Sequence, residues 1–329
     1  MRFSIIIPVF NRPDEVDELL QSLTTQTFTD FEVLVVEDGS SLPCQSVVGR
    51  YAGRLAVHYY LKPNSGPGHT RNSGAERAQG EYLIILDSDC VLPPDYLTEV
   101  ERELTREPAD AFGGPDAAHP SFTPLQKAIN YSMTSFFTTG GIRGGRKKMD
   151  KFYPRSFNMG VRREVYLALG GFSKMRFGED IDFSIRIFKG GYRCRLFPRA
   201  WVWHKRRTDL KKFFKQVHNS GIARINLYKK YPESLKLVHL LPGLFTLGVA
   251  FFLVGTLFCG YSILPLLLYA LLVCADASLQ NKSLRIGVLA IAAAYIQLIG
   301  YGTGFWRAWW NRCILGRGEM EAFKKNFYK

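Results

Sequence analysis

Two carboxylates stand two residues apart in the segment Asp87-Ser88-Asp89, directly after the apolar run Tyr82–Leu86. Hard cations such as Mg²⁺ take oxygen ligands, commonly one or two carboxylates together with substrate phosphates. The segment therefore suits an ion that bridges a diphosphate. An isolated Asp-x-Asp is more often a simple turn, so this interpretation depends on the other motifs of the chain.

The elements that must position these acids alternate along the first third of the chain. Ser4–Phe10, Phe31–Val36 and Tyr82–Leu86 have the composition of buried strands, and a helix with one apolar face begins at Pro13. Such alternation predicts an α/β fold with a parallel sheet. Ligands bind beyond the carboxyl ends of the strands in such sheets. Asp38, Asp87 and Asp89 all fall at predicted strand ends.

Seven short segments follow one another in an order that is typical of one enzyme family. They are Ser4–Asn11, Val33–Ser40, Asn64–Asn72, Asp87–Asp89, Phe157–Gly160, Gly170–Phe172 and Gly178–Asp180. In these segments the chain resembles the family 2 glycosyltransferases, which are inverting enzymes with the GT-A fold, from residue 3 to about residue 205. The resemblance implies a Rossmann-like, nucleotide-sugar-binding α/β domain.

The resemblance also implies donor-binding roles for individual residues. Asp38 matches the acid that binds the base of the nucleotide, and the backbone of Pro8 and Phe10 lines the same pocket. Arg71 matches an arginine near the base or the diphosphate, and Asp87 matches the acid on the ribose side. Without the family, Asp38 would be interpreted as a turn residue and Arg71 as a solvated surface cation.

The metal and the general base are implied in the same way. Asp89 matches the direct ligand of a divalent metal, Mg²⁺ or Mn²⁺, and His204 resembles a further metal ligand or a diphosphate contact. Asp180 matches the base that takes the proton of the acceptor hydroxyl in a single displacement, with Glu179 orienting the acceptor. The alternatives are a histidine at a strand end and a pair of acids at a helix N-terminus.

The composition of the rest of the chain indicates a membrane region. No Asp, Glu, Lys or Arg lies in the 39 residues between Lys236 and Asp276, and a second uncharged run covers Ile286 to Trp306. About twenty apolar residues span a bilayer, so Leu237–Phe258, Ser262–Ala277 and Ile286–Trp306 are three candidate helices, the first two forming a hairpin. The net charge of +14 gathers beside these runs, which favours anionic headgroups over nucleic acid as the partner.

We therefore expect a GT-A domain at 1–236, a membrane region at 237–306 and a basic tail at 307–329. No signal peptide precedes the first strand, so we expect the catalytic domain on the cytoplasmic side. A complete third span would export the basic tail, which the positive-inside rule opposes. The third segment is then a span, a re-entrant segment or an interfacial helix, and the sequence leaves these open, as it does the oligomeric state.

The predicted function is transfer of one sugar from a nucleotide-sugar, with UDP as the expected nucleotide, to a polyprenyl-linked oligosaccharide. Processive synthases of the family carry the motif Gln-x-x-Arg-Trp. In this chain the first Arg after Gln216 is Arg224, and no Trp directly follows it, which favours addition of a single sugar. The basic segment Arg143–Arg155 is a candidate lid or a solvated loop. Alternative functions are synthesis of a polyprenyl-monophosphate sugar, a nucleotidyl or phosphosugar transfer, and a non-catalytic membrane scaffold.

Overall fold

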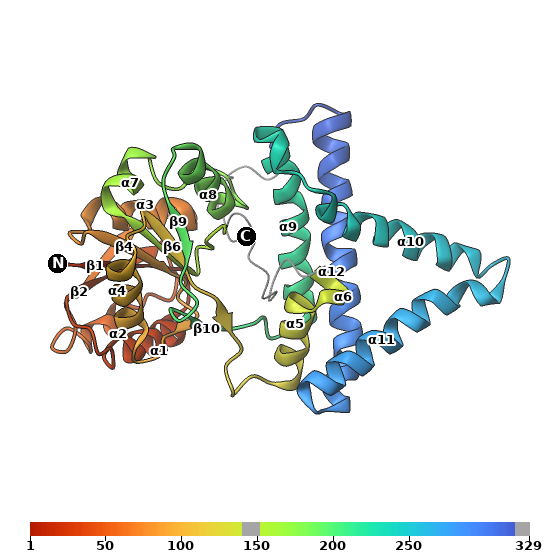
Figure 1. Ribbon diagram of the computed structural model, residues 1–329, viewed down its shortest axis with the longest axis horizontal. Coiled ribbons are helices and arrows are strands. Elements are labelled where there is room, and N and C mark those ends of the chain that lie inside the picture. Colours follow the sequence, from red (N-terminus) through yellow and green to blue (C-terminus); the bar gives the residue numbers. More distant parts are fainter. Residues whose placement is uncertain (140–151, 320–329) are drawn as a thin grey trace. The chain divides into compact units, whose positions relative to one another are not determined.

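A computed structural model of the protein describes residues 1–139 and 152–319 (Figure 1). They divide into two compact units, which we call the sheet unit (1–119 and 152–205) and the helical unit (120–139 and 206–319). The second segment of the helical unit begins at residue 206, before the first apolar run, which begins at Leu237. The domain boundaries at 236 and 306 stay a prediction. The glycine-rich basic stretch 140–148 lies outside the described residues.

The sheet unit is built on seven strands in the order β3-β2-β1-β4-β8-β6-β9. Their bounds are β1 Phe3–Val9, β2 Phe31–Asp38, β3 Val57–Lys62, β4 Tyr82–Leu86, β6 Ala111–Gly113, β8 Asn158–Arg162 and β9 Cys194–Leu196. The strands β1 to β4 are parallel, as predicted. The sheet as a whole is mixed, because β8 pairs antiparallel with both β4 and β6. The chain reaches β8 after a long excursion through the helical unit, so no right-handed strand–helix–strand crossover constrains its direction.

Both faces of this sheet are covered, which explains why its central strands are apolar at almost every position. Ile5 and Ile7 of β1 belong to one apolar cluster, and the intervening Ile6 belongs to the other. Helices pack on the two faces. They are α1 Pro13–Leu23, α2 Gln45–Gly49, α3 Pro67–Arg77, α4 Tyr96–Arg106, α7 Arg163–Ala168 and α8 Glu179–Lys189.

A second, three-stranded sheet brings distant segments together next to the end of β4. It has the order β5-β10-β7, with β5 at Cys90–Val91, β10 at Val202–His204 and β7 at Asp116–Ala117. His204 is paired in register with Cys90, and Val202 is paired with Asp116. The residue after the Asp-Ser-Asp segment is therefore held beside a histidine that lies more than a hundred positions further along the chain.

The helical unit consists of helices only among its described residues. They are α5 Pro124–Thr134, α6 Phe136–Thr139, α9 Leu210–Lys230, α10 Leu241–Gly255, α11 Leu264–Asn281 and α12 Leu284–Trp309, with short 3₁₀ or π turns at Pro232–Ser234, Leu237–His239, Gly260–Ile263 and Trp310–Ile314. Three helical stretches, Leu237–Gly255, Gly260–Asn281 and Leu284–Ile314, are long and apolar enough to cross a membrane. They correspond to the three predicted segments. The helices α10 and α11 form a hairpin that projects from α9 and α12 (Figure 1).

Glycines set the contact between α9 and α12, which run side by side in the same direction. A Cβ atom on Gly304 would lie 2.0 Å from the carbonyl oxygen of His218, and one on Gly221 would lie 2.1 Å from that of Tyr301. The two backbones therefore approach more closely than any side chain would permit. The Gly-x-Gly-x-Gly run of α12 serves close packing and does not break the helix.

Candidate active site

The carboxylates predicted to carry chemistry gather at the carboxyl ends of the parallel strands. Asp38 is the last residue of β2, and Asp87 and Asp89 directly follow β4. Pro8 lies near the end of β1, and Phe10 follows that strand. Because β1 lies between β2 and β4 in the sheet, these residues come from three neighbouring strand ends.

Asp89 and His204 form the centre of a possible metal site. Asp89 is 7% exposed, and its Oδ1 lies 3.2 Å from Nε2 of His204. The imidazole stacks on Phe157 with ring centroids 4.8 Å apart, and its Nδ1 lies 3.9 Å from a carboxylate oxygen of Asp116. A carboxylate and an oriented imidazole are ligands that Mg²⁺ and Mn²⁺ accept, with the remaining positions left to water and phosphate.

Cys90 completes a cluster of three potential ligands whose donor atoms lie within 4.8 Å of one another. Burial, followed by the charges of Asp89 and Asp87, raises the pKa of its thiol well above the ordinary value. The thiol also donates to the carbonyl of Phe157. Because a metal binds the thiolate, Cys90 is a poor ligand at neutral pH, and the site has the oxygen and nitrogen donors of a hard cation.

Two residues near the candidate metal ligands were not identified from the sequence. Nη1 of Arg12 donates to Oδ2 of Asp89 at 2.6 Å, so a fixed cation neutralises the carboxylate from one side. Asp116 faces the other nitrogen of His204. Burial alone would lower the pKa of His204, but Asp89 and Asp116 raise it to about 9. In the sequence, Pro13 directly after Arg12 indicates only that a helix begins there. That pattern does not predict the contact between Arg12 and Asp89.

Arg71 links the segment after β4 to the start of α8. Its guanidinium, 3% exposed, donates to Asp87 at 2.9 Å and to Glu179 at 3.0 Å. It also donates to Ser156 at 3.1 Å and lies over the ring of Phe172. An arginine committed to two carboxylates positions them relative to each other. This is a geometric connection between two motifs that are about ninety residues apart in the sequence.

The first turn of α8 carries Glu179 and Asp180. Gly178 precedes it with φ of +85°, a conformation that favours glycine. Asp180 is 8% exposed, and its Oδ2 accepts from Nε of Arg155 at 2.9 Å. Its Oδ1 accepts from the amide of Ile181. The helix-cap interpretation and the base interpretation are compatible for this residue.

The environment of Glu179 favours its protonated form. Burial raises the pKa of this carboxyl to about 7, with the charge of Asp180 acting in the same direction and Arg71 opposing both. A carboxyl with a pKa near neutrality exchanges its proton easily under physiological conditions. Glu179 therefore holds its proton more tightly than an ordinary glutamate does.

Asp38 is built into the loop that follows β3. It is 1% exposed, and Oδ1 accepts from Lys62 Nζ at 2.6 Å and from the amide of Ser65 at 2.9 Å. Its Oδ2 accepts from the amide of Gly66 at 2.8 Å. These contacts bind the carboxylate to the segment that begins α3. The role of Asp38 toward a nucleotide base stays a prediction.

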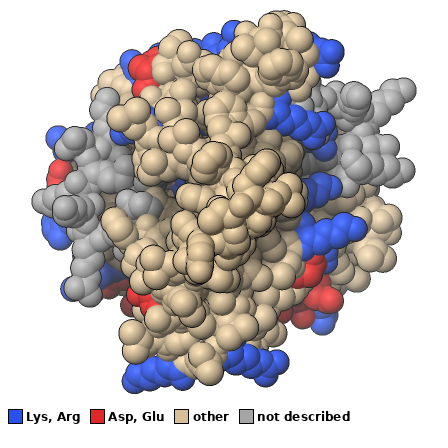
Figure 2. Space-filling model, turned by 90° about the vertical axis from the view of Figure 1, so that its right-hand side faces the viewer, with Lys and Arg blue, Asp and Glu red and all other residues tan. Residues whose placement is uncertain are grey.

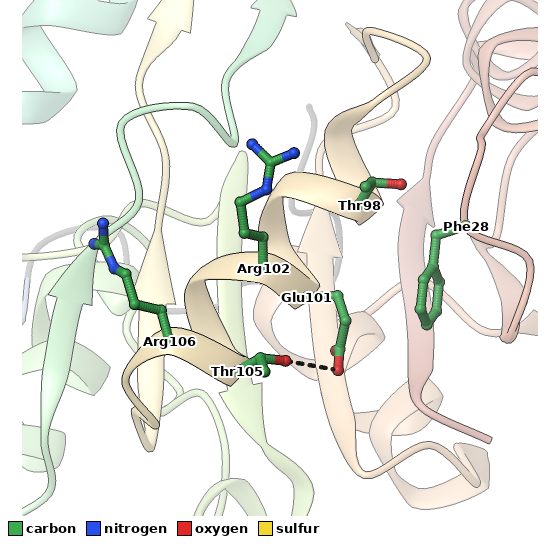
Figure 3. A pocket seen from close by; sticks show the side chains of 6 residues that line it. All are labelled: Phe28, Thr98, Glu101, Arg102, Thr105 and Arg106. Atoms are coloured by element: carbon green, nitrogen blue, oxygen red, sulfur yellow. Dashed lines mark hydrogen bonds between the residues drawn. The ribbon is translucent and has the colours of Figure 1, made fainter.

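A surface hollow in the sheet unit lies away from these acids (Figure 3). It is lined by Phe28 and by α4 residues, namely Thr98, Glu101, Arg102, Thr105 and Arg106. Phe28 contacts Phe3, the first residue of β1, so the hollow belongs to the amino ends of the strands. It is on the wrong edge of the sheet to join the cluster of carboxylates.

The described structure thus brings the predicted residues into three groups. Asp89 and His204 lie together, Arg71, Asp87 and Glu179 form a second group beside Asp180, and Asp38 is held by its own loop. The first two groups adjoin because Asp87 and Asp89 share one turn. The side-chain contacts of Asp38 described above are with Lys62, Ser65 and Gly66 of its own loop.

Comparison with known proteins identifies the family of the chain. The model of the family described as "Glycosyl transferase family 2" matches residues 4–170, just over half of the chain. An uncharacterised glycosyltransferase of Haemophilus influenzae is 29% identical over 188 residues, 56% of this chain and 62% of that protein. The poly(ribitol-phosphate) β-N-acetylglucosaminyltransferase TarS of Staphylococcus aureus is 35% identical over 116 residues, 34% of this chain and 20% of TarS.

Another relative is the putative teichuronic acid biosynthesis glycosyltransferase TuaG of Bacillus subtilis, 33% identical over 131 residues, 39% of this chain and 52% of TuaG. The chain thus spans less than two thirds of the length of each of these curated relatives. Among solved structures, the mannosyltransferase PcManGT of Pyrobaculum calidifontis, in complex with GDP-Man and Mn²⁺, aligns with a TM-score of 0.61 at 20% identity, covering 90% of this chain and 87% of that one. This likeness shows the GT-A fold. By the match of the family model, the chain belongs to glycosyl transferase family 2.

Proposed function

We propose that this protein transfers one sugar from a nucleotide-sugar to a lipid-linked oligosaccharide, with inversion and with the aid of Mg²⁺ or Mn²⁺. The observation that carries the proposal is the meeting of Asp89 and His204 beside the Arg71 group, whose member Glu179 directly precedes Asp180. Relatives named for teichuronic acid and poly(ribitol-phosphate) glycosylation support a role in cell-surface polysaccharide assembly.

Donor binding, in this proposal, uses the strand ends. Pro8, Phe10 and Asp38 lie at the ends of β1 and β2, where the base would be bound, and Asp87 would accept from a ribose hydroxyl. Asp89 and His204 would hold the metal, which when bound would neutralise the charge of the diphosphate leaving group. Arg12 would leave Asp89 as the metal enters, because both cations need the same carboxylate.

Asp180 would remove the proton of the acceptor hydroxyl while the sugar leaves its diphosphate. Arg155, which now pairs with Asp180, would move away to admit the acceptor. Glu179 and Arg71 would position the base and the donor site relative to each other, because Arg71 contacts both Glu179 and Asp87. A single displacement of this kind needs no covalent intermediate on the enzyme.

The lipid-linked acceptor is proposed from the helical unit of the same chain. Three helices that are long enough to cross a membrane follow the sheet unit, and an acceptor on a polyprenyl carrier would be found at that membrane. Basic residues beside the apolar runs favour the anionic cytoplasmic surface. We place the sheet unit on that side.

The test is nucleotide release by the full chain reconstituted in liposomes, with a panel of UDP-, GDP- and dTDP-sugars and either Mn²⁺ or EDTA. We expect one donor to give metal-dependent release that Asp89→Asn abolishes. Glu76→Gln, at an exposed carboxylate of α3, should behave as the wild type. Adding polyprenyl phosphate or a polyprenyl-diphosphate oligosaccharide separates the two acceptor classes. Absence of both release and nucleotide binding with every acceptor would favour a non-catalytic scaffold.

A further inference from the structure

The helices α10 and α11 expose many large apolar side chains, which is unfavourable in water. Between Leu241 and Asn281 the buried residues are Gly243, Val273 and Ala277. Large side chains exposed by half or more include Leu244, Leu247, Phe251, Val254, Leu257, Phe258, Tyr261, Leu267, Leu268 and Leu271. A continuous apolar surface of this kind marks contact with a partner or a membrane.

The face of the molecule that carries the hairpin tip has no charge at its centre. Figure 2 looks onto this face and shows the charged side chains, Lys and Arg as well as Asp and Glu, at its margins. Lys236, Lys282, Arg285 and Arg307 flank the uncharged runs 237–275 and 286–306 in the sequence. The uncharged centre fits the hydrocarbon of one leaflet, and the basic residues that flank the runs fit its anionic headgroups.

Three rings pack together across the hairpin and mark off the tip that lies beyond them. Phe245 of α10, Tyr269 of α11 and Tyr295 of α12 have ring centroids 5.1 to 5.8 Å apart. We call them the aromatic cluster. The hydroxyl of Tyr295 donates to Leu266, and that of Tyr269 donates to Phe137. Aromatic side chains with hydroxyl groups are characteristic of the membrane interface.

The free part of the hairpin is too short to cross a bilayer. From Phe245 to the end of α10 at Gly255 the helix rises about 15 Å, and from Tyr269 back to Leu264 about 8 Å. The hydrocarbon core is about 30 Å thick, so one leaflet contributes about 15 Å. Residues 256–263 extend the tip beyond Gly255, and the hairpin ends within the hydrocarbon without crossing it if the aromatic cluster lies at the interface.

Asp276 limits how far α11 can enter. Its carboxylate accepts from the hydroxyl of Tyr131 in α5 and from Gln280, one turn further along α11. The rise from Leu264 to Asp276 is about 18 Å. A tip that emerged on the far side would leave this carboxylate in hydrocarbon, which is costly.

The helix α12 is tied to a basic partner. Besides the glycine contacts, Arg312 donates to Asn226 at 2.6 Å, and Tyr228 stacks on Trp309, so α9 accompanies α12 over much of its length. Basic residues stand towards both ends of α9, at Lys211, Lys212 and Lys215 and at Arg224, Lys229 and Lys230. If α12 crossed the bilayer, α9 would carry charges through its centre at about 3 kcal/mol each.

We propose that the chain does not cross the membrane: α10 and α11 insert into one leaflet as a re-entrant hairpin, and α9 and α12 lie along the interface. The residues that follow α12 then stay on the side of the sheet unit, which enters α9 within a few residues of Lys205. This topology is independent of the sugar, the metal and the acceptor.

Native Cys259, exposed at the hairpin tip, provides the test. In the full chain, Cys194, Cys274 and Cys313 are changed to Ala, and one marker cysteine is added, at exposed Leu42 or at Gly318, where a Cβ meets nothing within 4 Å. A membrane-impermeant maleimide is applied to sealed right-side-out and inverted vesicles. We expect both markers to react in the same vesicles, and Cys259 to react in neither until detergent is added.

Reaction of Cys259 from the side opposite to Leu42→Cys would overturn the proposal, since the hairpin would then span. Reaction of Gly318→Cys from the opposite side would show that α12 spans, and reaction of Cys259 from the marker side would show that the hairpin is outside the lipid. If the alanine variants do not fold, an epitope tag after Lys329 in the wild-type chain keeps the test open. Protease should remove it in the vesicles that expose the sheet unit, and removal only in the opposite vesicles would refute the topology.

Discussion

In the sheet unit, charged groups are buried and paired: Asp38, Arg71 and Asp89 are each at most 7% exposed and each contact an opposite charge. In the helical unit the situation is reversed, because Phe251, Leu257 and Phe258 are between 72% and 87% exposed. The exposed and buried side chains of the two units therefore suit different surroundings. Buried charges need partners in a protein interior, whereas lipid-facing helices bury backbone contacts and present apolar side chains.

This difference has a consequence for mutations. In the sheet unit a substitution that keeps the shape but removes a charge should have the larger effect. In the helical unit charge matters less than volume, because backbone contacts at Gly221 and Gly304 hold α9 and α12 together. The four changes below test that division, beginning with the largest expected effect.

Asp180→Asn should lower kcat/KM for sugar transfer by about a thousandfold, since general-base catalysis commonly contributes 10²- to 10⁴-fold. The fold should be retained because the amide keeps the shape. The matched control is Asp182→Asn, two residues along α8, where the carboxylate is fully buried and pairs with Arg186. That variant should lose stability and keep most of its kcat. Equal losses of activity in the two variants would remove the case for Asp180 as base.

Gly304→Leu should destabilise the helical unit by roughly 2 kcal/mol or more, because the new side chain meets the backbone of α9 and overpacking is costly. We expect faster proteolysis between residues 206 and 319 in detergent, with nucleotide binding by the sheet unit unchanged. Gly248→Leu on α10 is the control, since nothing lies within 4 Å of its Cβ position. Similar proteolysis of both variants would contradict the close α9–α12 contact.

Glu179 should make the stability of the sheet unit depend on pH. Its pKa is raised from 4.5 to about 7 by burial, so the folded state binds the proton more tightly than the unfolded state does. The associated stability is fully present below pH 4.5 and is lost as the pH rises through 7, on the order of 3 kcal/mol in all. Thermal melts from pH 5 to 8 should show this slope, and Glu179→Gln should flatten it. An unchanged slope would assign the effect to other groups.

Arg12→Gln should tighten Mn²⁺ binding by about fivefold, or roughly 1 kcal/mol, because it removes the cation that competes for Asp89. Calorimetric titration with Mn²⁺ in the absence of donor measures this directly. Arg50→Gln, at an exposed arginine paired with Asp17, is the control and should leave the affinity unchanged. Weaker binding in Arg12→Gln would mean that the arginine supports the metal site.

Much of the fold could be predicted from local patterns. The strands that became β1, β2 and β4 were recognisable because both faces of each are buried, which leaves an uninterrupted apolar run. The helices α10 to α12 were recognisable from the absence of charge over more than twenty residues. The direction of β8 could not be predicted, because the residue pattern of a five-residue strand is the same whichever way the strand runs.

The candidate site divides in the same way. That Asp87 and Asp89 follow a buried strand, and that Glu179 and Asp180 begin a helix, was determined by the sequence alone, because a strand end and a helix start are local events. Only the tertiary structure joined Arg12 to Asp89, Asp116 to His204 and Arg71 to both Asp87 and Glu179. These contacts depend on how the sheets and helices pack across 16 to 108 residues of chain. The local periodicity of the sequence contains no information about contacts between segments so far apart in the chain.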